Sequence, residues 1–416
     1  IYFQSQHIRD AVLEAQSMLS KDPNNLAARR LLARIYVRTL GDLSDTSGQR
    51  DTLVRATEQY REIVRLDPAD TDAALWLARL YRLQNDHEKA ETVLRGLLAR
   101  EPENENGVEQ FTQLLLDEGK SQEAIHSLQG ILQRAPTARL WDLLGDAYNQ
   151  IHDLPNAEQA YRKAAEAQPD DINHRRGLAQ TLLSEEKYPE ALEQYLRLAD
   201  MDSDNPDNYL RQAEIYRQMK QLDKAEQSVL LAKQRAPGSL EVIYYESSIY
   251  EAQGRFEDSI RVLSDAVTGV KAQSEFTPAR RRTLAILYQQ LGQLYRETSN
   301  YSAAVNTFEE MLRLGPEEDR RARVMIIETH RQARDIPKAL DAARKALETY
   351  PKDRPIRVTQ ALLYGANAQT DQAAALLRQL LDGSAADFEI QLDLAQVYEQ
   401  GKRWTEAEQA VHAAEK

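Results

Sequence analysis

The sequence has no cysteine in its 416 residues, which excludes disulfides, thiol chemistry and cysteine-bound metals. It has no apolar run long enough to span a membrane, and no low-complexity or strand-rich segment. Asp and Glu number 66 against 53 Lys and Arg, so the formal net charge is −13. Proteins that bind nucleic acid usually carry a basic face and a high isoelectric point. The composition therefore argues against a nucleic-acid partner.

Motifs for catalysis and cofactor binding are also missing. The chain contains no glycine-rich phosphate loop or dinucleotide-binding pattern, and no Gly-x-Ser-x-Gly turn for a nucleophilic serine. Its seven histidines are scattered, and no pair has metal-ligand spacing on a helix. Neighbouring carboxylates such as Glu185 and Glu186 are more typical of solvated helix ends than of a catalytic pair. We therefore predict no catalytic residues, no metal and no cofactor.

The chain does contain a pattern that returns about every 34 residues. Its clearest copy consists of Trp141, Leu144, Gly145, Tyr148, Ala157, Tyr161, Ala164 and Pro169. The helical spacing of these residues predicts two helices per repeat. The glycine and the alanines fall where the two helices must approach closely, so a larger side chain there would overpack. A proline ends most repeats, because proline cannot continue a helix.

This spacing resembles the tetratricopeptide repeat family, and the resemblance covers nearly the whole chain. It implies an all-α fold, a right-handed superhelical solenoid of stacked antiparallel helix pairs. We place a half repeat at 6–25 and about eleven repeats over 26–416, as a single solenoid. Residues 1–5 resemble the remnant of a cleavable expression tag. The chain also stops inside a second helix, so we expect it to be a piece of a longer protein.

Two insertions interrupt the repeat period. A polar insertion lies near 39–51, and the other lies near 274–284. In the second, Thr277 and Pro278 form the sequence expected at a helix N-cap and first helical position. We therefore predict that the following helix begins early.

The resemblance implies that the first helices of successive repeats line a concave groove for a partner segment. In the first two repeats, the exposed groove positions carry five arginines and a tryptophan: Arg30, Arg34, Arg38, Arg79, Arg82 and Trp76. Arginine binds carboxylates and phosphates through paired hydrogen bonds. One interpretation is a basic pocket for an acidic segment or a carboxyl terminus. The alternative is that the arginines pair with nearby acids and stabilise their helices.

Further along, the groove positions are mixed in charge. The candidates for partner binding are Asn149, Arg176, Gln180, Arg211, Arg217, Tyr244, Gln293 and Arg296, with Asp146 and Glu214 among their acidic neighbours. Amides and arginines in such rows can hold a peptide backbone, and one tyrosine could anchor a partner. The family's two-carboxylate clamp for chaperone tails requires lysine and asparagine one turn apart on one first helix, and lysine and arginine on the next. This chain has Arg30 and Arg34 on one helix and Asp72 and Trp76 on the next. A chaperone tail is therefore not expected.

The leading functional prediction is a non-catalytic scaffold for protein–protein interaction. One alternative is the regulatory or substrate-docking arm of a larger enzyme, for example a glycosyltransferase. Another is a periplasmic assembly factor of a bacterial secretion system. The alanine-rich repeats and the lack of cysteine suit a bacterial source. We expect a soluble segment of the bacterial cytoplasm or periplasm, and the absence of cysteine does not choose between the two compartments.

Overall fold

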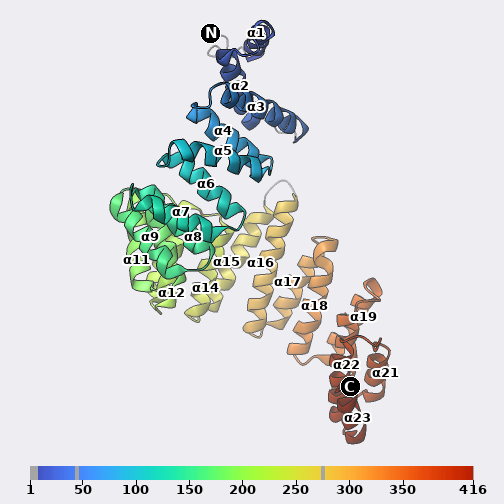
Figure 1. The fold of residues 1–416 in the computed structure, drawn as a ribbon. Helices are drawn as coiled ribbons and strands as arrows, with labels where there is room; N and C mark the ends of the chain where they lie inside the picture. Colours follow the sequence, from blue (N-terminus) through green and yellow to red (C-terminus); the bar gives the residue numbers. More distant parts are fainter. Residues whose placement is uncertain (1–7, 43–45, 273–276, 416) are drawn as a thin grey trace. The chain divides into compact units, whose positions relative to one another are not determined.

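The computed structural model describes residues 8–42, 46–272 and 277–415. Over these residues the chain forms 23 α-helices and no strand (Figure 1), which confirms the all-α prediction. The predicted tag remnant at 1–5 lies outside the described residues, as do 43–45 and 273–276 within the two insertions. None of the helices in the described part is long and apolar enough to cross a membrane.

The helices divide into two compact units, one up to Ser203 and one from Asp204. The helices of the first unit are α1 (Ile8–Lys21), α2 (Leu26–Asp42), α3 (Thr46–Leu66), α4 (Thr71–Leu83), α5 (His87–Arg100), α6 (Glu105–Asp117), α7 (Ser121–Leu132), α8 (Ala138–Gln150), α9 (Leu154–Ala167), α10 (Ile172–Ser184) and α11 (Tyr188–Met201). Those of the second unit are α12 (Pro206–Gln218), α13 (Leu222–Arg235), α14 (Leu240–Ala252), α15 (Phe256–Lys271), α16 (Pro278–Glu297), α17 (Tyr301–Leu312), α18 (Pro316–Gln332), α19 (Ile336–Thr349), α20 (Arg354–Ala366), α21 (Thr370–Arg378), α22 (Asp387–Gln400) and α23 (Trp404–Ala414). The single solenoid across 6–416 stays a prediction.

Within each unit, consecutive helices pack against each other as a stack of hairpins. The first helix of a pair also contacts the first helix of the next pair, as α4, α6, α8 and α10 do in the first unit and α12 and α14 do in the second. We call these even-numbered helices the inner row and the odd-numbered helices the outer row. Each unit is thus a solenoid in which every repeat is stabilised mainly by its neighbours.

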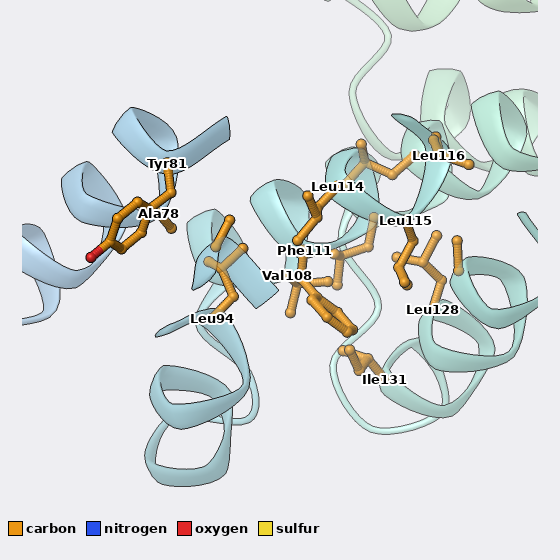
Figure 2. Packing of buried hydrophobic residues seen from close by; sticks show 14 of the residues in the cluster. Ala78, Tyr81, Leu94, Val108, Phe111, Leu114, Leu115, Leu116, Leu128 and Ile131 are labelled. Carbon is orange, nitrogen blue, oxygen red and sulfur yellow. The ribbon is translucent and has the colours of Figure 1, made fainter. Parts of the chain in front are cut away.

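The core of the first unit lies between the two rows (Figure 2). Leu94 on α5, Leu114 and Leu115 on α6, and Leu128 on α7 are all fully buried. These side chains come from both helices of one pair and from the pair before it. Because a hairpin cannot bury its apolar face alone, stacking the hairpins creates one continuous core.

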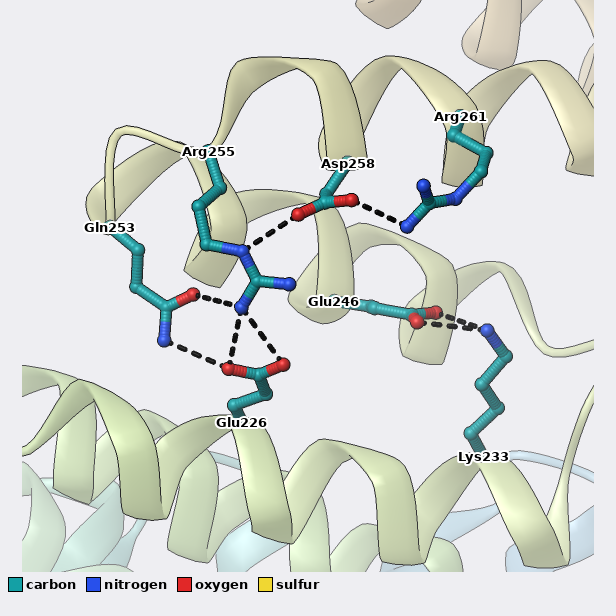
Figure 3. Close-up of polar contacts among 7 residues, drawn as sticks. All are labelled: Glu226, Lys233, Glu246, Gln253, Arg255, Asp258 and Arg261. Carbon is teal, nitrogen blue, oxygen red and sulfur yellow. Dashed lines mark hydrogen bonds and ion pairs between the residues drawn. The ribbon is translucent and has the colours of Figure 1, made fainter.

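Ion pairs link neighbouring helices of the outer row. The same kind of link recurs every two repeats along the chain. A glutamate on one outer helix meets the basic residue at the N-cap of the next, in the pairs Glu91–Lys120 (3.6 Å), Glu158–Lys187 (2.5 Å) and Glu226–Arg255 (2.9 Å). Figure 3 shows the last pair, in which Arg255 also binds Asp258 of its own helix. These contacts fasten neighbouring repeats to each other on the outer side of the stack.

A left-handed residue closes the turn inside each of ten described helix pairs. Its φ lies between 57° and 74° at Asn85, Gly119, His152, Glu186, Lys220, Gly254, Ser299, Arg334, Ala368 and Lys402. In the α20–α21 turn, the amide of Gln369 donates to the carbonyl of Tyr364 at 2.9 Å, which is the helix-ending bond of a Schellman motif. Only two of the ten positions carry glycine, although this conformation strains other residues.

We predict that Ala368→Gly stabilises the protein by about 0.5–1 kcal/mol, because glycine adopts the left-handed conformation without a Cβ clash. The matched control is Ala375→Gly, an exposed position inside α21 where glycine should cost about 1 kcal/mol. Urea unfolding followed by circular dichroism measures both. A loss of stability in Ala368→Gly as large as that in the control would contradict the assigned turn.

The two insertions mainly lengthen helices. The helix after the second insertion, α16, begins at Pro278 and is 20 residues long, and the Thr277 side chain accepts a hydrogen bond from the Arg280 amide. The predicted early start is confirmed. Around the first insertion, α2 extends to Asp42 and α3 begins at Thr46, so these helices have 17 and 21 residues against 13 in α4.

Candidate functional site

The inner row of the first unit contains two adjoining cavities, which we call the N-terminal groove. The smaller, about 420 Å³, lies between α2 and α4, and its lining includes Arg30, Arg34 and Tyr60. The larger, about 550 Å³, lies between α4 and α6, and its lining includes Arg79 and Arg82. Both cavities are lined by Asp72 and Trp76 of α4. These two residues therefore stand at the centre of the groove.

Trp76 is held by aromatic and cationic neighbours. Its ring stacks on Tyr60, with centroids 6.1 Å apart and an interplanar angle of 20°. The Arg79 guanidinium lies 5.4 Å from the Trp76 centroid, at the distance of a cation–π contact. Tyr60 is buried, and burial raises the pKa of its hydroxyl to about 12. The groove thus presents a rigid aromatic surface with a guanidinium already placed against it.

Acidic residues neutralise part of the positive charge in this groove. Arg30 binds Asp70 at 2.7 Å and Asp67 at 3.0 Å, and the carboxylate of Asp70 raises the pKa of Arg30. Arg82 binds Asp117 at 2.5 Å. Arg38, on the same helix as Arg30, also has an interaction partner.

Arg34 and Arg79 differ from these three arginines. Neither forms an ion pair with any residue that the structure describes. They line different cavities, and Trp76 lines both. Two guanidiniums without an ion pair, in cavities that share an indole, can bind carboxylates of a segment whose apolar side chain contacts the tryptophan.

Side-chain amides of α6 line the larger cavity, and the sequence analysis did not select them. Asn106, Gln110 and Gln113 all face it, and the Gln110 Oε1 atom is buried without a hydrogen-bond partner in the described chain. Gln110 and Gln113 stand 34 residues after Trp76 and Arg79. Adding the 34-residue repeat period to Trp76 and Arg79 would therefore have predicted Gln110 and Gln113 as groove residues.

The remaining predicted residues of the first unit lie on α8 and α10. The Asn149 amide donates to the Tyr161 hydroxyl at 3.3 Å. The Arg176 guanidinium lies 3.9 Å from the Asp202 carboxylate, and Gln180 is exposed on α10. These residues lie on inner helices beyond α6 and do not line either cavity of the N-terminal groove.

In the second unit, the predicted residues form local contacts. Arg211 binds Glu214 at 2.7 Å and donates to the Tyr245 hydroxyl at 3.2 Å. Tyr244 is 53% exposed and packs edge-on against Tyr245. Arg217 has a buried Nε without a hydrogen-bond partner in the described chain, and Arg296 donates to Gln293 at 2.7 Å. Tyr244 is the aromatic side chain of this group that is open to a partner.

Comparisons with known proteins agree with this architecture. A family model described as a tetratricopeptide repeat-like domain matches residues 43–185, and a tetratricopeptide repeat model matches 176–239, 290–354 and 358–416. The superkiller protein 3 of Schizosaccharomyces pombe is 27% identical over 173 residues, which are 40% of this chain and 12% of that protein. The chain therefore spans a small part of that relative's length.

Solved structures are also similar. One is pilF of Pseudomonas aeruginosa, with 21% identity and a TM-score of 0.40 over 53% of this chain and 99% of that chain. Another is YrrB, described as a repeat protein with an unusual peptide-binding site, with 17% identity and a TM-score of 0.38 over 45% of this chain and 98% of that chain.

Proposed function

Because the chain belongs to the tetratricopeptide repeat family, whose repeats typically mediate protein–protein interaction, we propose that it is a non-catalytic scaffold. It binds an extended segment of a protein partner in the N-terminal groove. The observation that carries this proposal is the pair of guanidiniums without an ion pair, Arg34 and Arg79, which line two cavities that share Trp76. Cationic side chains without a carboxylate partner on a folded surface favour ligands of the opposite sign.

The chemistry of the groove favours a segment with acidic and apolar side chains. Carboxylates of the segment bind Arg34 and Arg79, and an apolar side chain packs on Trp76. The amides of Gln110 and Gln113 can both donate and accept, so they suit a peptide backbone. Arg30 and Arg82 are already paired with Asp70 and Asp117, so we expect them to contribute less to partner binding than Arg34 and Arg79.

Charge reversal in the groove should strongly reduce partner capture and leave the fold intact. The test variant is Arg34→Glu with Arg79→Glu, and adding Arg30→Glu also breaks the ion pairs to Asp67 and Asp70. Each substitution replaces an attraction for the partner's carboxylates with a repulsion, so we expect at least about a tenfold loss of bound partner. A crosslinking pull-down from lysate of the source cells, quantified against wild type, measures it.

The matched control is Arg55→Glu with Arg61→Glu on α3 of the outer row. Both arginines are exposed and form no ion pair with a described residue, so the change in net charge is the same. Circular dichroism should show unchanged helicity in all variants. Equal capture of the partner by wild type and by the groove variant would contradict the proposal that the N-terminal groove binds the partner.

A further inference from the structure

Another cavity of the first unit is lined by residues of α7, α8 and α9, and it shares no lining residue with the N-terminal groove. We call it the α7–α9 cavity, and its volume is about 500 Å³. Its lining includes the buried side chains of Leu132, Leu144 and Ala160. Trp141 and Tyr148 of α8, which are half-buried, line it as well. A concave site of this size with apolar and aromatic walls is typical of a ligand pocket.

Besides the Tyr148 hydroxyl, one lysine and four side-chain amides supply the polar lining of this cavity. The Lys163 Nζ atom lies 4.1 Å from the centroid of the Trp141 ring, at the distance of a cation–π contact. The Gln129 amide donates to the Tyr148 hydroxyl at 2.8 Å. The other three amides belong to Gln133, Asn156 and Gln159. The cavity thus combines an apolar floor with a placed cation and groups that both donate and accept hydrogen bonds.

Lys163 has no carboxylate partner among the residues that the structure describes. The adjacent Arg162 differs, because it binds Glu158 of its own helix. The equivalent position on α11, ten residues after the N-cap, is Arg197, which binds Glu193 at 2.7 Å. No aspartate or glutamate lines the α7–α9 cavity either. Charge complementarity therefore favours a ligand that brings its own anionic group to Lys163.

The cavity lies at a junction of the outer row that has no ion pair in the described part of the chain. The pair Glu91–Lys120 joins α5 to α7, and the pair Glu158–Lys187 joins α9 to α11. No such pair joins α7 to α9 among the described residues. A ligand in the cavity would therefore contact both helices where the protein supplies no charged link of its own.

We propose that the α7–α9 cavity binds a short segment of a protein partner, with an apolar side chain next to an aspartate or glutamate. The apolar side chain packs against Leu144 and Tyr148, and the carboxylate binds Lys163. The amides of Gln133 and Gln159 suit the backbone of the segment. This site is separate from the N-terminal groove and does not depend on the function proposed for that groove.

The test is selection from a random peptide library displayed on phage. The bait is the Arg34→Gln, Arg79→Gln protein, in which the N-terminal groove no longer attracts acidic segments. Recovered peptides are synthesised, and their affinities for wild type and for variants of the α7–α9 cavity are measured by fluorescence anisotropy. Lys163→Gln removes the cation, and Lys163→Arg keeps it. Gln159→Glu places a carboxylate one helical turn before Lys163, where it can pair with the lysine.

The matched control is Lys352→Gln in the second unit. Lys352 is exposed and forms no ion pair with a described residue, so the change in net charge equals that of Lys163→Gln. We expect acidic peptides with an apolar residue, whose affinity falls at least about tenfold in Lys163→Gln and in Gln159→Glu. Lys163→Arg and the control should bind them like wild type.

Two results would overturn this inference and leave the proposal for the N-terminal groove intact. One is that the selection recovers no peptide, and the other is that no recovered peptide loses affinity in Lys163→Gln. Thermal unfolding separates binding from a structural role. Glutamate at 159 pairs with Lys163 along the helix, so the melting temperature of Gln159→Glu without peptide should not fall below that of wild type. If Lys163 served only to hold Trp141, Gln159→Glu would bind the peptides with unchanged affinity.

Discussion

Replacing Gly145 with leucine is expected to destabilise the protein by about 2–3 kcal/mol. A Cβ atom at this position would lie 2.7 Å from the ring of Tyr161, which is closer than real side chains approach. The ring itself is 3% exposed and packs between two inner helices. A Cβ at Gly177, on α10, would lie 2.6 Å from the same ring. Because glycines bound Tyr161 on both sides, the ring cannot move away from the added leucine.

The control for this prediction is Gly96→Leu in α5. Gly96 is an exposed helical glycine with no atom within 4 Å of an added Cβ. Leucine is the better helix former, so this variant should gain up to about 1 kcal/mol. Urea unfolding measures both variants. Unchanged unfolding of Gly145→Leu would contradict the placement of Gly145 against Tyr161 and the repeat register built on it.

Alkaline pH should destabilise the protein steeply between pH 10 and pH 12. Burial raises the pKa of Tyr60 and of Tyr245 from 10.0 to about 12. Burial and the nearby Asp146 carboxylate raise the pKa of Tyr161 as well. In the unfolded chain, the tyrosines lose their protons near pH 10. Ionisation therefore favours the unfolded state above pH 10, and stability is lost as pH rises toward the folded-state pKa.

The size of this effect follows from the two tyrosines with a pKa of about 12. A shift of one pKa unit corresponds to about 1.4 kcal/mol, and partial solvent exposure reduces the contribution, so we expect a combined loss of about 2–4 kcal/mol. Urea midpoints measured from pH 9 to pH 12 test it. Tyr60→Phe removes one of these groups and should show a smaller loss over this interval. A flat profile for wild type would show that these hydroxyls ionise equally in the folded and unfolded states.

The sequence predicted best those features that depend on residue type and spacing within one repeat. The close approach at Gly145 and the early start of α16 at Thr277 both follow from residue type and spacing, and the structure contains both. The left-handed turns were not predicted. Asn85, Glu186 and Ala368 share no residue type, because the hydrogen bonds that end the preceding helix impose the conformation.

The candidate site was only partly predictable for a different reason. The five arginines were visible in the sequence, but their partners come from elsewhere in the chain. Asp70 is 40 residues from Arg30, and Asp117 is 35 residues from Arg82. Sequence spacing alone could not tell these paired arginines from Arg34 and Arg79. The pairing depends on which side chains the stacked helices bring together.

The most direct test of the central claim is site-specific photo-crosslinking in lysate from the source cells. A photo-reactive residue replaces Gln113, on the inner row, in one protein, and Glu58, exposed on outer helix α3, in another. The account predicts a crosslinked partner at Gln113 that disappears when Arg34 and Arg79 are changed to glutamate, and none at Glu58. A partner crosslinked at Glu58 and not at Gln113 would place recognition on the outer row and contradict the account.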